Sequence, residues 1–340
     1  MSTLIFYGKV SLEGIQVENW LTTVQHTTEK VLTLRKRKKL RQKQKQQAKH
    51  PVLDWLEAFI WAAGVVLLIN QYLFQAYQIP SGSMIDTLLI KDHIFVNKII
   101  FGPELIPGKF KIPSVFKPER NDVMIFENPT YISRGPTFDI FQRVLYMLTL
   151  SLVDIDKDEN GNPKPHFLIK RAVAVSGDSI RFRKGEVQIK PPGFEEWLDE
   201  SYFKELSGVS DRSRRMIDSS EYTAIRASAY IDAYKNSSIK VNENLILKTS
   251  GSSGSIGDMF AWMKYRNEAL YAINPYEKRY GNLWRKFDIG WYIPDGYLMP
   301  LGDNRDNSKD GRYFGPVSLD NVLGKAMFKY WPLKRIGKIK

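Results

Sequence analysis

Two serines in one short turn are the first residues whose types and spacing suit chemistry. The segment from Ile79 to Met84 reads Ile-Pro-Ser-Gly-Ser-Met, so that glycine separates Ser81 from Ser83. This order favours a bend that projects a side-chain oxygen and leaves backbone N–H groups free to donate. An ordinary turn after a helix fits the same six residues. Other parts of the chain must therefore decide whether one serine is a nucleophile.

Lys170 is the residue best suited to activate such a serine. A hydroxyl becomes nucleophilic when a base takes its proton, and a neutral lysine can be that base. Residues Phe167 to Val175 predict a strand in which Lys170 shares a face with Leu168, Ala172 and Ala174. Burial on that face would lower the lysine pKa by about three units and cost roughly 4 kcal/mol. The alternative is a lysine that extends to solvent at a strand edge.

A third segment, Gly302 to Arg312, is dense in groups that form ion pairs. It contains two arginines, three aspartates and one serine within eleven residues. A polar turn in which Asp and Asn side chains cap their own backbone explains part of this composition. The same groups could also form a buried scaffold beside a catalytic lysine.

The sequence offers little for thiol or metal chemistry. It contains no cysteine, which excludes disulfides, thiol nucleophiles and cysteine metal sites. The four histidines are scattered and form no spaced pair with a carboxylate that suggests zinc ligation. These residues therefore predict no metal site of these kinds. The histidines are His26, His50, His93 and His166.

An apolar segment from Leu56 to Tyr77 precedes the serine turn almost directly and must position it. It is long enough to cross a bilayer, with an unbroken apolar run from Ala58 to Ile69 and aromatic residues near both ends. Ten lysines and arginines, and no Asp or Glu, lie between Lys30 and Lys49 and supply most of the net charge of +13. We interpret residues 55–77 as an uncleaved transmembrane anchor and residues 1–54 as a cytosolic basic segment.

Three other interpretations fit these segments less well. The basic tract could bind nucleic acid, but a tract that ends just before an apolar helix is more typical of the cytosolic flank of a membrane span, where it meets anionic lipid. A cleaved secretory signal would need a basic region of some fifty residues, and no clear small-x-small cleavage site follows the apolar run. A buried core helix fits the length and flanks less well. We therefore expect membrane lipid, and no nucleic acid, as a partner.

Beyond the anchor, short strands separated by Gly, Pro and Asn predict a mostly β fold. We expect an antiparallel β-sheet catalytic domain in two parts, residues 78–190 and 290–340. Between them, residues 191–289 predict an inserted, mixed α/β subdomain with a flexible loop at Ser250 to Ser255. Strands are expected at Asp92 to Ile100, Asp122 to Phe126, Phe167 to Val175, Gly185 to Lys190 and Gly290 to Leu301, and helices near residues 195–206 and 222–234.

One apolar and aromatic segment, Phe138 to Val153, is too short and too interrupted to span a membrane. It fits a helix on the membrane surface and a helix packed on the β core equally well.

Taken together and in this order, these segments resemble bacterial type I signal peptidase, the leader peptidase family of Ser/Lys proteases. Gly302 to Arg312 is the most specific part of the resemblance. The matching regions are the anchor, Ile79 to Leu88, Arg120 to Phe126, Phe167 to Asp178 and Tyr297 to Gly315.

The resemblance implies roles for individual residues. Ser83 matches the nucleophile and Lys170 the general base. Ser81 matches the serine whose hydroxyl joins the Ser83 N–H in the oxyanion hole, and Ser308 the serine that orients the lysine amine. A supporting ion-pair set is implied for Arg171, Asp310 and Arg312, with Asp303 and Arg305 in the same motif. Shallow apolar pockets for small side chains are implied at Ile79, Met84 and Ile169.

The family also implies an activity and a location. The chain would be a membrane-anchored serine endopeptidase that removes signal peptides from exported preproteins after Ala-x-Ala-like sequences, through an acyl-enzyme. The resemblance also implies that no metal and no cofactor is required. It would lie in the bacterial cytoplasmic membrane with its N-terminus in the cytosol and its catalytic domain on the extracytoplasmic face. Two positions depart from the family pattern: Asp86 stands where proline is usual, and Asn121-Asp122 where Gly-Asp is usual.

Two rival functions come from other classes. Ser114 to Lys117 fits the Ser-x-x-Lys motif of penicillin-interacting enzymes, with Lys248 to Ser250 a loose echo of Lys-Thr-Gly. That motif must open a helix, however, and Pro113 and Pro118 bracket it. The second rival is a non-enzymatic, membrane-tethered adaptor that binds anionic lipid through the basic tract.

Overall fold

The computed structural model describes residues 22–30, 33–34, 36–40, 51–106, 110–114, 116–149, 152–157, 161, 164–209, 213–249 and 257–339. The chain divides into two compact units, residues 1–64 and residues 65–340. In the first unit, residues 22–30 and 36–40 are helical. About half of the basic tract and the expected loop at Ser250 to Ser255 lie outside the described residues.

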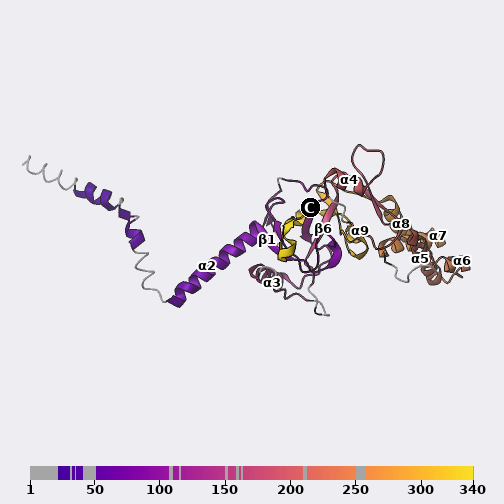
Figure 1. Cartoon of the computed structure of the whole chain (residues 1–340), viewed down its shortest axis with the longest axis horizontal. Coiled ribbons are helices and arrows are strands. Elements are labelled where there is room, and N and C mark those ends of the chain that lie inside the picture. Colours follow the sequence, from indigo (N-terminus) through magenta and orange to yellow (C-terminus); the bar gives the residue numbers. More distant parts are fainter. Residues whose placement is uncertain are drawn as a thin grey trace, which may run out of the picture. The chain divides into compact units, whose positions relative to one another are not determined.

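The apolar segment forms helix α2, Pro51–Tyr72 (Figure 1). Its apolar side chains are mostly exposed. Within the described residues it is the one helix long and apolar enough to cross a membrane. The helix ends earlier than the predicted anchor, because Phe74–Gln78 forms strand β1 and pairs with the next strand. The ammonium of Lys98 donates to the last carbonyls of the helix, at Asn70 (3.4 Å) and Gln71 (3.3 Å), which a helix end otherwise leaves unsatisfied.

An eight-stranded antiparallel sheet is the centre of the second unit (Figure 1). Along the sheet the order is β1, β2, β13, β5, β6, β11, β12, with β14 paired to β13. The strands after β1 are β2 (His93–Asn97), β5 (Val123–Glu127), β6 (Phe167–Val175), β11 (Tyr297–Leu301), β12 (Val317–Ser318), β13 (Val322–Trp331) and β14 (Gly337–Lys338). A separate hairpin joins β3 (Glu104–Ile106) to β4 (Phe110–Lys111).

Alternating side chains explain why this sheet buries both of its faces. In β5, Val123 and Ile125 pack into one cluster while Met124 and Phe126 pack into another, as the two-residue period of a strand requires. The expected strands at β2, β5, β6, β8 (Glu186–Lys190) and β11 are confirmed, and β6 has the predicted bounds. The sheet thereby brings segments that are far apart in sequence next to β6.

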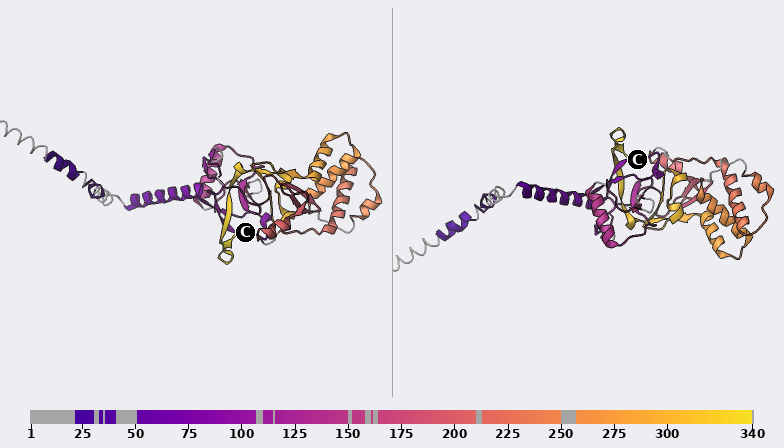
Figure 2. Two further views of the ribbon diagram at one scale, coloured as in Figure 1. Left: turned by 90° about the horizontal axis from the view of Figure 1, so that it is seen from above. Right: turned by 90° about the horizontal axis from the view of Figure 1, so that it is seen from below.

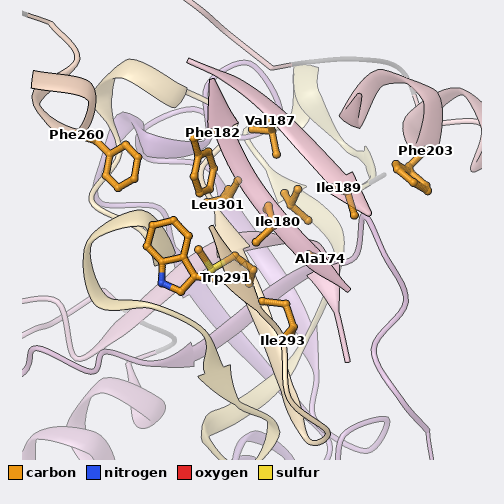
Figure 3. Close-up of a cluster of buried hydrophobic side chains, with 12 residues drawn as sticks. Ala174, Ile180, Phe182, Val187, Ile189, Phe203, Phe260, Trp291, Ile293 and Leu301 are labelled. Carbon is orange, nitrogen blue, oxygen red and sulfur yellow. The ribbon is translucent and has the colours of Figure 1, made fainter. Parts of the chain in front are cut away.

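A second, four-stranded sheet packs beside the first. Its order is β10 (Trp291–Tyr292), β7 (Ser179–Arg183), β8, β9 (Leu198–Asp199). Figure 3 shows that its inner face meets residues of β6 and β11 in one apolar cluster, which includes Phe182, Ile180, Trp291 and Leu301. Burial of large aromatic and aliphatic side chains is the main stabilising contribution in such a core.

Residues 191–289 are more helical than the predicted mixed subdomain. They contribute strand β9 and helices α4 (Glu200–Leu206), α5 (Tyr222–Asn236), α6 (Glu243–Leu247), α7 (Met259–Ile273) and α8 (Lys278–Ile289). Helix α7 packs against α5 and α8, and the three lie together in Figure 2. The predicted "mostly β" fold thus describes the paired sheets and not the whole chain. Buried alanines on α5 and α7 allow these two helices to pack closely. The boundaries proposed at residues 190 and 290 stay a prediction.

The apolar segment near residue 140 forms helix α3, Pro136–Leu148. Within the second unit this helix is partly packed: Met147 is buried, and the ring of Tyr146 contacts the ring of Tyr77. Ile140 and Phe141 are exposed. The helix is therefore partly packed and keeps exposed apolar side chains, and both predicted alternatives stay predictions.

Candidate active site

The serine turn lies between β1 and β2, where Gly82–Met84 forms one turn of 3₁₀ helix. Ser81 precedes it in an extended conformation and makes no capping hydrogen bond with its side chain. Two carbonyls of the turn are held from outside: the Asn304 N–H donates to Ser83 O (3.0 Å), and the Asn304 side-chain amide donates to Gly82 O (3.0 Å). The turn is thus fixed by its partner loop.

Lys170 reaches Ser83 from strand β6. Its Nζ lies 2.5 Å from Ser83 Oγ, although the two residues are 87 positions apart in the chain. Met124 lies opposite Lys170 across the β5–β6 pair, and Leu168 and Ala172 join the same apolar cluster. The expected burial of Lys170 is confirmed, since its side chain is 3% exposed.

Burial lowers the pKa of Lys170 from 10.5 to about 8. The desolvated ammonium is the main cause. Asp310 and Asp303 oppose the shift because they attract the charged form, while Arg312 adds to it. A lysine with this pKa is neutral in an appreciable fraction of molecules near neutral pH, which is the state in which it accepts a proton from a hydroxyl.

The loop Gly302–Arg312 follows β11 and contacts the serine turn directly. Gly302 is required by this contact, because a Cβ there would lie 2.2 Å from Ser308 Oγ and 2.6 Å from Ser83 O. Both backbone groups of Gly302 are held: its N–H donates to Asp310 (2.9 Å), and Arg305 Nε donates to its carbonyl (2.9 Å).

Two buried ion pairs stabilise this loop. Arg171 donates two hydrogen bonds to Asp303, at 2.8 and 2.7 Å, and both side chains are 1% exposed. Arg312 pairs with Asp310 at 2.9 Å. The predicted grouping of Arg171 with Asp310 and Arg312 is therefore divided between two pairs, and Asp303 is the partner of Arg171. Arg305 pairs instead with Glu200 of helix α4, at 2.5 Å.

Ser308 lies in the same loop beside Gly302. Its side-chain oxygen is buried and has no hydrogen-bond partner among the residues that the structure describes. The predicted role of Ser308 in orienting the lysine amine stays a prediction.

A cleft of about 780 Å³ opens over Ser83 and Lys170. Ile79, Met84 and Ile169 line it, together with Ser81. Strand β6 pairs with β5 along residues 167–171 on one side and with β11 along residues 171–175 on the other. Of the strands that the structure describes, none pairs with residues 167–170 on that second side. The cleft therefore borders an unoccupied strand edge.

Three contact residues had no assigned role in the sequence analysis. Asn304 lies inside the motif, and a loop asparagine is a residue type that commonly holds backbone groups. Thr87 donates to Asp303 (2.5 Å) and lies four residues after the nucleophile candidate. The pairing of Glu200 with Arg305 has no local signal in the sequence, because the two residues are 105 positions apart.

The Ser-x-x-Lys rival is not favoured by the geometry. Ser114 and its described neighbours are not helical, and the Ser114 hydroxyl donates to Ile100 O (2.9 Å). Val115 and Ser250 lie outside the described residues. In the described ranges, no group of three or more His, Asp or Glu side chains gathers as a metal site would require.

The chain is similar to proteins of one family. A family model described as signal peptidase, peptidase S26, matches residues 52–331. Signal peptidase I of Buchnera aphidicola is 27% identical, over 85% of this chain and 77% of that protein. Signal peptidase I of Aquifex aeolicus is 26% identical, over 78% of this chain and 79% of that protein. A crystal structure of a signal peptidase I from Enterococcus faecalis aligns with 17% identity and a TM-score of 0.23, covering 62% of this chain and 98% of that one.

Proposed function

Since the chain belongs to the signal peptidase family, peptidase S26, we propose that Ser83 and Lys170 are the nucleophile and general base with which it removes signal peptides. The observation that carries this proposal is the 2.5 Å contact between Lys170 Nζ and Ser83 Oγ, made by a lysine that is 3% exposed. Burial supplies the neutral amine, and contact gives that amine a proton to accept.

The reaction is acyl transfer in two steps. Neutral Lys170 takes the Ser83 proton as Oγ attacks the scissile carbonyl, and the oxyanion accepts hydrogen bonds from the Ser83 N–H and the Ser81 hydroxyl. The C–N bond then breaks, the lysine proton passes to the leaving amine of the mature protein, and an ester links the signal peptide to Ser83. Lys170 next activates a water that hydrolyses the ester and frees the signal peptide.

The loop Gly302–Arg312 supports this dyad. Arg171 with Asp303, and Arg312 with Asp310, hold the loop by buried ion pairs, and Arg305 fixes the Gly302 carbonyl. Asp303 and Asp310 also keep the pKa of Lys170 from falling further. Ser308 is proposed to orient the lysine amine when substrate or water occupies the cleft.

The substrate binds as an added strand. The free edge of β6 at residues 167–170 offers backbone groups to an extended peptide, a recurring mode of peptide recognition. Ile79, Met84 and Ile169 line the cleft that contains Ser83, and we propose that they form shallow apolar pockets for small side chains. Cleavage after an Ala-x-Ala-like sequence is part of this proposal.

Helix α2 is proposed to anchor the enzyme in the bacterial cytoplasmic membrane. Its length and exposed apolar side chains suit a span. The basic tract before it favours a cytosolic N-terminus and contact with anionic lipid, which puts the catalytic domain on the extracytoplasmic face. The serine turn begins ten residues after α2 ends, so preprotein cleavage would occur near the membrane surface.

Cleavage of a preprotein by full-length protein in detergent tests the proposal. Ser83→Ala and Lys170→Ala should each abolish cleavage, while Ser114→Ala should leave it unchanged. The Ser114 variant is a matched control because its hydroxyl belongs to the rival motif. Retained cleavage in either dyad variant would exclude this mechanism, and loss of cleavage in Ser114→Ala alone would favour the rival.

A further inference from the structure

Arg305 connects the loop Gly302–Arg312 to helix α4. Its side chain is buried, and its Nε donates to the carbonyl of Gly302 (2.9 Å). Its two terminal nitrogens donate to the two carboxylate oxygens of Glu200, at 2.5 and 2.6 Å. Two parallel bonds of this kind fix the plane of a guanidinium as well as its position.

Glu200 begins helix α4 and is itself held in place. It is 7% exposed, and Lys204, one helical turn later, pairs with it at 2.9 Å. Burial raises the pKa of its carboxyl, but the charges of Arg305 and Lys204 outweigh burial and lower it to about 2. Glu200 is therefore ionised at neutral pH.

A second contact comes from residues 213–217. The Arg214 N–H donates to Asp303 O (2.7 Å), and the Arg305 N–H donates to Arg214 O (3.0 Å). The backbone N–H groups of Met216 and Ile217 donate to Asp306 at 2.5 and 3.1 Å. Backbone and side-chain bonds thus fasten the first half of the loop Gly302–Arg312 to a segment about ninety residues earlier in the chain.

The loop passes this constraint to the nucleophile. Asn304, between the two residues that pair with Arg214, donates to the carbonyls of Gly82 and Ser83. Gly302, which Arg305 holds, lies within contact distance of Ser83 O and Ser308 Oγ. A continuous set of hydrogen bonds therefore runs from Glu200 through Arg305 and the loop to Ser83.

We propose that Glu200 is a positioning residue for the Ser83–Lys170 dyad, acting through Arg305 to hold the loop Gly302–Arg312 against the serine turn. This inference rests on the proposed function. It gives the inserted region a part in catalysis without contact with substrate.

Loss of Glu200 would disturb the loop in a particular way. An unpaired buried guanidinium seeks another carboxylate, and Asp303 already attracts Arg305. Asp303 is the partner of Arg171, so a shift of Arg305 toward it would break the pair that orders the loop beside Lys170. We therefore expect a loss of kcat and not of substrate binding, since the cleft lining of Ile79, Met84 and Ile169 is untouched.

The first experiment compares Glu200→Gln with Asp178→Asn in full-length protein, with preprotein cleavage as the readout. Asp178 is a matched control, because it is also buried and accepts two hydrogen bonds from one arginine, Arg120, at 2.7 Å. We expect Glu200→Gln to lower kcat roughly 10- to 100-fold with KM within about threefold, and Glu200→Asp to recover part of the loss. Asp178→Asn should keep kcat within about threefold at a similar loss of thermal stability.

A double variant keeps the test decisive if Glu200→Gln folds poorly. Glu200→Gln with Arg305→Leu removes the charges of both partners, while Lys204 keeps its bond to the Ser213 hydroxyl and an amide oxygen beside it, so the fold should recover. The proposal expects stability near that of the wild type and kcat still reduced roughly 10-fold or more. A double variant that cleaves at the wild-type rate, or a Glu200→Gln variant with unchanged kcat, overturns the inference alone. If the wild type cleaves no faster than Ser83→Ala, the proposed function fails as well.

Discussion

Two buried lysines, Lys98 and Lys170, differ in what their ammonium groups contact. Each is 3% exposed, and burial lowers the pKa of each from 10.5 to about 8. Lys98 donates to the backbone carbonyls at the end of helix α2, whereas Lys170 donates to the hydroxyl of Ser83. Carbonyls have no proton to give. A perturbed pKa therefore marks both lysines, and the chemistry of the contacted group distinguishes a structural lysine from a candidate base.

The largest expected difference between the two lysines is in cleavage. Lys170→Met should lower kcat/KM for a preprotein by about four orders of magnitude or more, because the nucleophile loses its base. Lys98→Met should keep kcat/KM within about threefold, since only the end of α2 is affected. Steady-state cleavage by the two variants checks this, and equal losses in both would remove the functional distinction between the lysines.

Removal of the Ser81 hydroxyl should have the next largest effect on cleavage. Ser81→Ala should lower kcat roughly 100- to 1,000-fold, the usual cost of one oxyanion-hole donor, with little change in KM. No similar effect is expected for a hydroxyl deletion outside the cleft, such as Ser114→Ala. Single-turnover cleavage separates the chemical step from product release. A kcat within twofold of wild type in Ser81→Ala would remove Ser81 from the oxyanion hole.

The two lysine variants, Lys170→Met and Lys98→Met, should also differ in stability. At pH 7 both lysines are charged in the unfolded state and mostly charged in the folded state. Each therefore carries most of the cost of burying its ammonium, roughly 3 kcal/mol for a shift of about 2.5 pKa units. Lys170→Met removes that cost and should raise the free energy of unfolding at pH 7 by about 2–3 kcal/mol. Lys98→Met also leaves two carbonyls without a donor, at about 1–3 kcal/mol, and should change stability by less than about 1 kcal/mol.

Denaturant unfolding at pH 7 measures this difference, with pH 11 as the internal control. The unfolded chain binds the extra protons between pH 8 and 10.5, so wild-type stability should rise across that window and the advantage of Lys170→Met should vanish above it. An advantage that persists at pH 11 would arise from packing and not from charge.

Sequence patterning alone does not separate these lysines. Both occupy apolar faces of predicted strands: Lys98 follows Ile94 and Val96 at two-residue spacing, as Lys170 follows Leu168. The serine turn and the Gly302–Arg312 motif, which occur with Lys170 in one chain, distinguish it. Strands β5 and β6 were predictable because Asp122 to Phe126 is a compact apolar run and Phe167 to Val175 alternates.

The sequence predicted which residues belong to the site better than it predicted which of them pair with each other. The motif supplies its Arg and Asp residues, but which arginine meets which aspartate depends on the path of the loop after β11, and Arg171 takes Asp303. The pair between Arg305 and Glu200 joins residues 105 positions apart, beyond any local pattern. The end of α2 was misplaced because Phe74–Tyr77 is apolar enough for a helix, while pairing with β2 determines its strand conformation.

The smallest expected effect is the most specific, and it lies in the pH dependence of cleavage. Because protonated Lys170 cannot accept the Ser83 proton, kcat/KM should fall tenfold per pH unit below a midpoint near pH 8. Lys98→Met should leave that midpoint within about 0.3 units, since its ammonium does not contact Ser83. His166 lines the same cleft and burial lowers its pKa, so a midpoint at or below about 6.5 that disappears in His166→Gln would identify a histidine base instead. A midpoint near 8 that survives His166→Gln assigns the limb to Lys170. Lys98, whose pKa burial also lowers to about 8, contacts carbonyls at the end of α2 and not Ser83.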